Sequence, residues 1–109
     1  MDEMYVGAMK VRMIVRESHS LKDKRQVLNS IKDKLKNGFN VSVAEVDEQE
    51  NRQMIVLGIA MIGNESQHVR NGLEKIAQAL RLHPIAEFVD QTTEIYRRLI
   101  YEFCNRMQP

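Results

Sequence analysis

Hydrophobic and polar residues alternate near the beginning of the chain. Between Tyr5 and Val15 the odd-numbered residues are mostly apolar, while Lys10 and Arg12 occupy even positions. A period of two with one polar face predicts a half-buried strand. Further apolar segments predict three more strands, at about 40–46, 52–62 and 85–92. The third is apolar at almost every position, which is typical of a strand that is central or covered on both faces.

Two other segments repeat their apolar residues every three to four positions, which predicts helices. The first begins after Ser20, which forms a capping-box-like pair with Asp23. It should end at Asn37-Gly38, because glycine reaches the left-handed conformation that ends many helices. The second runs from about Ser66 to His83-Pro84, since a residue before proline disfavours helix. The apolar stripe of the first helix includes one lysine: Leu21, Lys24, Leu28, Ile31 and Leu35.

The order strand, helix, strand, strand, helix, strand predicts an α+β fold. The expected architecture is a ferredoxin-like βαββαβ sandwich, in which a four-stranded antiparallel sheet carries two helices on one face. We assign residues 1–95 to this domain and 96–109 to a C-terminal tail. In the tail, apolar residues at every fourth position predict a short amphipathic helix. That helix would cover the open sheet face of its own subunit, bind a second subunit or, as a third option, fray.

Composition narrows the possible partners. Sixteen basic and fifteen acidic residues give a net charge of +1, so an anionic partner would have to bind a local patch. The single cysteine, Cys104, excludes an internal disulfide and is typical of a reducing compartment. There is no apolar run of the roughly 18 residues that a membrane helix needs, and the first residues are acidic where a signal peptide is basic. We expect a cytoplasmic protein without membrane contact.

Three cations lie within four residues at the start of the first helix, in the sequence Ser-His-Ser-Leu-Lys-Asp-Lys-Arg (18–25). Cations are mildly unfavourable there because the helix dipole is positive at that end. Together with free N–H groups they could instead bind a phosphate backbone. The alternative is an ordinary solvated helix face. The candidate RNA-binding residues are Lys22, Lys24, Arg25 and Lys32, with His19 and Ser20 beside them.

A second hypothesis is a homodimeric protein-interaction module. The third strand is apolar on both faces, and an exposed apolar face of that size is rarely left uncovered. The candidate contact residues come from this strand and the tail: Met54, Val56, Ala60, Leu99 and Phe103. A small-molecule effector domain of the ACT type ranks last, because no glycine-rich ligand loop is present.

No motif indicates an enzyme, a metal or a cofactor. The three histidines are far apart in the sequence, so no zinc-ligand spacing exists. The acidic residues between 45 and 50 are best interpreted as a hydrated hairpin turn. The third strand offers no aromatic side chains on which RNA bases could stack, so any RNA contact should be electrostatic.

Two short motifs resemble the YlxP-like bacterial proteins, a ferredoxin-like family of unknown function. They are Ser20-Leu21-Lys22-Asp23-Lys24-Arg25 and Phe39-Asn40-Val41-Ser42-Val43-Ala44-Glu45-Val46. The resemblance implies an RNA-linked role, because genes of the family often lie among translation and ribosome-maturation genes, and it brings no catalytic residues. Where family members often carry Trp-Gln-Arg, this chain has Arg52-Gln53-Met54.

Overall fold

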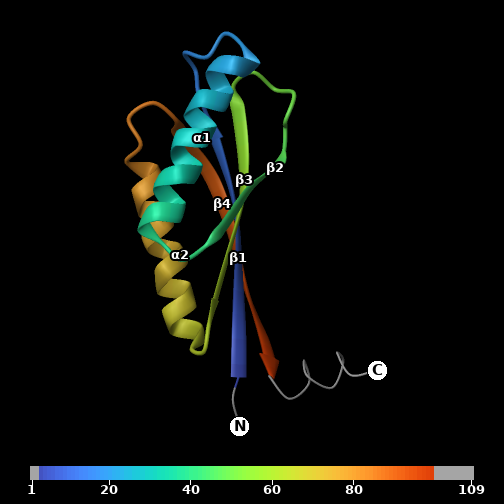
Figure 1. Cartoon of the computed structure of the whole chain (residues 1–109), viewed down its shortest axis with the longest axis vertical. Coiled ribbons are helices and arrows are strands. Elements are labelled where there is room, and N and C mark those ends of the chain that lie inside the picture. Colours follow the sequence, from blue (N-terminus) through green and yellow to red (C-terminus); the bar gives the residue numbers. More distant parts are fainter. Residues whose placement is uncertain (1–2, 100–109) are drawn as a thin grey trace.

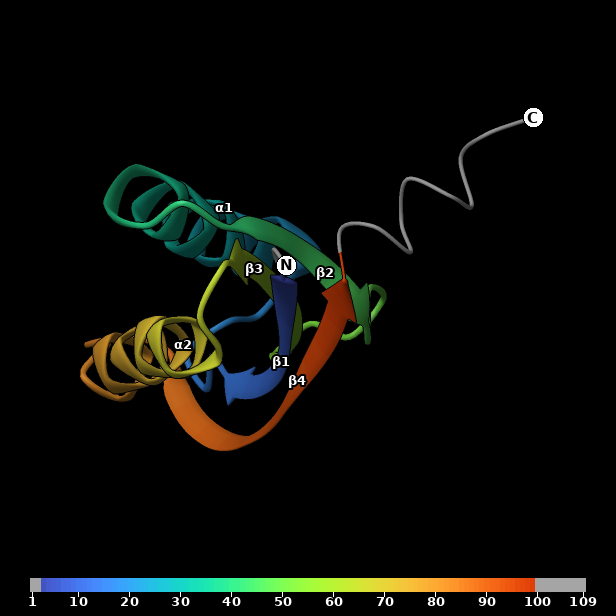
Figure 2. The same cartoon turned by 90° about the horizontal axis from the view of Figure 1, so that it is seen from below.

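Both helices lie on one face of a four-stranded sheet in the computed structural model, which describes residues 3–99 and the side chains of residues 3–97 (Figures 1 and 2). The sheet order is β2-β3-β1-β4 and every neighbouring pair is antiparallel. This is the predicted ferredoxin-like βαββαβ order. The elements are β1 Glu3–Ile14, α1 Leu21–Gly38, β2 Ser42–Asp47, β3 Met54–Gly63, α2 Ser66–Arg81 and β4 Glu87–Leu99.

The core fills the space between the sheet and the two helices. Successive side chains of a strand point to opposite faces, so the odd-numbered residues of β1 and β3 face the helices. Those side chains are buried against the apolar stripes of α1 and α2. The central members of this core are Met9, Val11, Met13, Ile55, Leu57, Ile59, Leu28, Ile31, Leu35, Val69, Leu73 and Ile76.

The predicted tail helix is wrong where the structure describes the tail. β4 does not end near Thr92 but continues to Leu99, and Tyr96 pairs with Val6 of β1. β1 begins at Glu3, so the backbone N–H and C=O groups of its first residues need hydrogen-bond partners. The extension of β4 supplies these partners. The domain boundary placed after residue 95 therefore falls inside β4. Residues 100–109, including Phe103, lie outside the described residues.

The predicted boundaries of α1 are confirmed, but the helix does not end through a left-handed glycine as predicted. The Ser20 hydroxyl accepts the N–H of Asp23 at 3.1 Å, and the Asp23 carboxylate accepts the N–H of His19 at 3.1 Å. At the other end Gly38 is the last helical residue, yet none of the glycines in residues 3–99 has a positive φ. The chain instead leaves the helix through extended Phe39, whose N–H donates to a carbonyl of the last turn.

Candidate functional site

Four cations of α1 form a stripe along one side of the helix. Lys22, Arg25 and Lys36 are exposed and Lys32 is half-buried. At 100° per residue these four positions fall within about a quarter of the helix circumference. Within residues 3–97, none of the four lies within 4.0 Å of a carboxylate oxygen in an ion pair. We refer to Lys22, Arg25, Lys32 and Lys36 as the cationic stripe.

Lys24 is not part of this stripe, and its assignment as a phosphate-facing residue is wrong. Its side chain is 0% exposed and passes beneath the β2–β3 loop. The ammonium donates to the carbonyl oxygens of Glu48 at 2.8 Å, Met54 at 3.2 Å and Gln49 at 3.4 Å. The Glu45 carboxylate lies 3.0 Å from it. Lys24 therefore fastens the start of α1 to the β2–β3 loop.

The charge balance at this buried site is maintained without a hydrogen bond between the charged groups. An ammonium has three donors, and all three are used by two carbonyls of the β2–β3 loop and that of Met54, the first residue of β3. The nearer Glu45 oxygen, Oε2, accordingly accepts no hydrogen bond, although it is close enough for a strong Coulomb attraction. The prediction that the acids of residues 45–50 all belong to a hydrated turn is therefore wrong for Glu45, which is half-buried and faces Lys24.

The segment before α1 is also fastened to the β2–β3 loop. Ser18 is 4% exposed, and its hydroxyl lies 2.7 Å from the carbonyl of Arg52 and 3.0 Å from that of Ser20. The Gln53 amide donates to the carbonyl of Arg16 at 3.0 Å. Ser20 is used as the helix cap, whereas His19 is exposed. The described geometry thus leaves His19, Lys22, Arg25 and Lys32 as the predicted residues accessible to an anionic partner.

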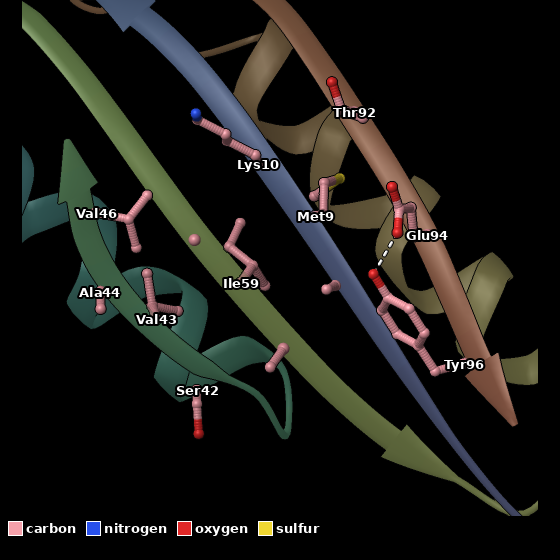
Figure 3. Close-up of a pocket in the computed structure, with 13 residues that line it drawn as sticks. Met9, Lys10, Ser42, Val43, Ala44, Val46, Ile59, Thr92, Glu94 and Tyr96 are labelled. Atoms are coloured by element: carbon pink, nitrogen blue, oxygen red, sulfur yellow. Dashed lines mark hydrogen bonds between the residues drawn. The ribbon is translucent and has the colours of Figure 1, made fainter. Parts of the chain in front are cut away.

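The open face of the sheet carries an apolar groove of about 550 Å³. Its floor consists of small residues on the two central strands, Ala8, Gly58 and Ala60. Val46 and Tyr96, on the outer strands β2 and β4, form its sides and are 51% and 52% exposed (Figure 3). We refer to the hollow lined by these five residues and Ala44 as the sheet groove.

A β-bulge shapes one side of the sheet groove. The register between β2 and β3 shifts between Glu45 and Asp47, which leaves Val46 as the extra residue. The Val46 side chain then lies over Gly58, where an added Cβ would approach it to 2.7 Å. Glycine is thus the residue at this position that allows the close contact. The pKa of Tyr96, on the opposite side, is raised because its hydroxyl donates a hydrogen bond to Glu94.

The predicted contact patch on β3 overlaps the sheet groove only in part. Ala60 lies in its floor, but Val56 is 1% exposed and therefore unavailable to a partner, and Met54 is half-buried. These two residues line a separate polar hollow with Arg12 and Asp90. Arg12 Nε donates to Asp90 Oδ1 at 2.8 Å and lowers the pKa of that carboxyl. Leu99, also predicted, is the last residue of β4.

His83 stabilises a turn. Its Nδ1 accepts the backbone N–H groups of Ala86 at 3.0 Å and Ile85 at 3.2 Å. Burial, and to a lesser extent the nearby positive charge of Lys34, lower its pKa. Across the described part of the chain, no group of three His, Cys, Asp or Glu side chains could hold a metal ion. None of the helices within residues 3–99 is long and apolar enough to cross a membrane.

Comparison with known proteins identifies relatives of unknown function. Residues 6–93 match the family model described as "Protein of unknown function (DUF503)". The chain is similar to "Uncharacterized protein YlxP" of Bacillus subtilis (strain 168), with 29% identity over 94 residues that cover 86% of this chain and 92% of that protein. A solved structure, "De novo designed protein Foldit4", is similar with a TM-score of 0.47 and 15% identity, and the match covers 88% of this chain and 97% of the designed one.

Proposed function

The chain belongs to the DUF503 family of proteins of unknown function, and we propose that this member is a non-enzymatic accessory protein that binds RNA through the cationic stripe of α1. The family match confirms the resemblance drawn from the two sequence motifs, and it names no activity. The observation that carries the proposal is that three of these cations are exposed and the fourth is half-buried, and that none has a carboxylate partner among residues 3–97.

The length and position of the stripe support a phosphate-backbone contact. From Lys22 to Lys36 the helix rises about 21 Å, which is long enough to meet several phosphates of one strand. Lys34 lies on a different side of α1, close to His83 at the end of α2. The stripe is therefore on the side of α1 turned away from α2, where a strand of RNA could approach without contacting the second helix.

RNA would be held by charge and shape rather than by base stacking. RNA-recognition motifs stack bases on aromatic residues of the two central strands. On the described open face, β1 and β3 present Ala8, Gly58 and Ala60 at the corresponding positions. The aromatic side chain that lines this face, Tyr96, is on the outer strand β4. A ribosomal RNA or a ribonucleoprotein surface with an accessible backbone is the partner class that fits these features.

The test is fluorescence anisotropy with small-subunit ribosomal RNA at low and at physiological salt. Binding through phosphates should weaken linearly in a log–log plot against salt, with a slope of about −0.7 to −0.9 per contact. The combined variant Lys22→Ala, Arg25→Ala, Lys32→Ala should bind more weakly and with a shallower slope, while its circular dichroism spectrum is unchanged.

The matched control loses the same charge elsewhere. Lys34→Ala, Arg70→Ala, Lys75→Ala removes three exposed cations from other sides of α1 and α2. This control should retain most of the affinity and the salt slope. Equal losses in the two triple variants would show that only net charge matters, and unchanged affinity in the first would remove the cationic stripe from the mechanism.

A further inference from the structure

The sheet groove is an apolar hollow that faces solvent in the described part of the chain. Its floor of small residues, Ala8, Gly58 and Ala60, lies between the projecting side chains of Val46 and Tyr96. The neighbouring side chain of Ile62 on the same face is 62% exposed. Contiguous exposed apolar surface of this kind usually marks a place where another segment or protein binds.

The shape of the groove disfavours a second copy as its occupant. A two-fold dimer brings the same surface of each subunit together, so that surface must be complementary to itself. Two hollow faces would meet at their sides, Val46 and Tyr96, and leave the small residues of the two floors apart. Close packing requires instead a convex occupant, such as one helix or one strand, whose bulky side chains reach the floor.

The chain itself supplies an apolar segment of this kind immediately after β4. Residues 100–107 place apolar side chains at spacings of three, one and three: Ile100, Phe103, Cys104 and Met107. Tyr101, Glu102, Asn105 and Arg106 occupy the positions between them. This is the pattern of a two-turn amphipathic helix with one apolar face.

The position where β4 ends places this segment next to the groove. Tyr96 forms one side of the groove, and β4 ends three residues later, at Leu99. Ten residues follow, which span about 15 Å as a helix and more when extended. A segment tethered this closely has a high effective concentration at the groove of its own chain. We propose that residues 100–109 turn back over the open sheet face and fill the sheet groove of the same molecule.

Paramagnetic relaxation in solution tests this placement on the full chain. Cys104 is the single cysteine, so Cys104→Ser with Asn105→Cys provides one thiol on the polar side of the segment for a nitroxide spin label. We expect the label to weaken the amide signals of the groove floor, Ala8, Gly58 and Ala60. Signals of the exposed, helix-side residues of α2, such as Lys75 and Gln78, should keep their intensity.

A mixed sample distinguishes the same chain from a second one. Isotope-labelled protein without the nitroxide is combined with spin-labelled protein that carries no isotope. Our proposal requires that the floor signals keep their intensity in this mixture. Weakening of the floor signals in the mixture would place the segment of a second copy in the groove, and full intensity in both samples would show that the segment lies elsewhere. Either result overturns the proposal.

A pair of substitutions tests the apolar contact without a label. Phe103→Asp introduces a charge on the apolar side of the segment, and Asn105→Asp introduces the same charge on its polar side. We expect the amide resonances of Ala8, Gly58 and Ala60 to shift in the first variant and to stay in place in the second. Equal shifts in both variants, or shifts in neither, would contradict the proposed packing.

Discussion

Lys24 and its neighbours Lys22 and Arg25 carry the same charge within four residues, yet they lie in opposite environments. Lys24 is fully buried beneath the β2–β3 loop, where three carbonyl oxygens and the Glu45 carboxylate surround its ammonium. Lys22 and Arg25 are exposed and have no carboxylate partner among residues 3–97. The helical repeat places them on different faces of α1, because Lys24 lies on the same buried face as Leu28, Ile31 and Leu35.

The difference teaches that clustered cations in a sequence do not define one surface. A buried ammonium is stable only with its donors satisfied and an opposite charge nearby. The β2–β3 loop meets both conditions for Lys24, so that residue stabilises the fold. The cations of the stripe remain hydrated, so their effect on folding should be small and their effect on anionic partners larger.

The largest expected effect follows from removing the buried ammonium. Lys24→Met retains an unbranched chain but leaves three carbonyls unpaired and the Glu45 charge uncompensated. Loss of one member of a buried pair costs about 3–5 kcal/mol. We expect a decrease of that size in the free energy of unfolding measured with urea. Lys22→Met, the exposed counterpart, should change it by less than about 0.5 kcal/mol. Equal effects of the two variants would contradict the contrast between them.

A smaller effect is expected from the hydrogen bonds that fasten the segment before α1. Ser18→Ala removes the buried hydroxyl that lies within hydrogen-bonding distance of the Arg52 and Ser20 carbonyls. Unpaired buried polar groups cost about 1–3 kcal/mol, and the same denaturation measurement should show a loss in that range. Ser30→Ala, at an exposed position of α1, serves as the control. A Ser18 variant as stable as this control would mean that water replaces the lost contacts.

The partly buried His83 should make the free energy of unfolding depend on pH. Its pKa is lowered in the folded protein, while the unfolded chain has a value of about 6.5. Between these two values the unfolded chain binds more protons, so the free energy of unfolding should fall as pH decreases below about 6.5. Protonation would also place a hydrogen on Nδ1 and so break the two backbone hydrogen bonds that this nitrogen accepts.

The control for this pH dependence is His83→Asn, which keeps an acceptor oxygen but does not titrate. Thermal unfolding followed between pH 7.5 and pH 5.5, with pH chosen in steps across the range, should show a steeper decline for the parent protein than for the variant. Parallel curves would exclude His83 as the origin of the slope.

The smallest expected effect comes from reversing the charge of stripe residues at the two ends of α1. The change in the free energy of unfolding should have opposite signs at the two ends. Lys22 lies in the first turn of α1, where a negative charge is favourable, and Lys36 lies in the last turn, where a positive charge is favourable. Lys22→Glu should therefore raise the free energy of unfolding by about 0.3–1 kcal/mol at low salt, and Lys36→Glu should lower it by a similar amount. Added salt should reduce both changes. Lys22→Glu should at the same time weaken RNA binding.

The sequence pattern predicted most of the fold because hydrophobic periodicity is local. The alternation in β1 and the stripes of α1 and α2 locate the core without any knowledge of their partners. The end of β4 was mispredicted because the apolar spacing of Ile95 and Leu99 is typical of a helix. In the structure these residues form a strand because they pair with β1. This pairing depends on how far β1 extends, and the length of β1 cannot be inferred from residues 93–99 alone.

The candidate site was predicted less completely, and the missed residues share a cause. Lys24 occupied the apolar stripe in the sequence, which was a usable sign of burial. Ser18, Gln53 and Glu45 offered no local sign, since their roles arise from contacts between the β2–β3 loop and the start of α1. The sheet groove was equally hidden, because it depends on the bulge at Val46 opposite Gly58.

The sequence by itself determined the order of strands and helices, the buried faces and the capped start of α1, because these follow from the spacing and chemistry of neighbouring residues. Only the tertiary structure decided which cation is buried and which are exposed, and where the open face is hollow. The physical reason is that the cost of burying a charge depends on groups brought close by folding: three carbonyls and one carboxylate lie around Lys24, whereas Lys22 and Arg25 remain in water.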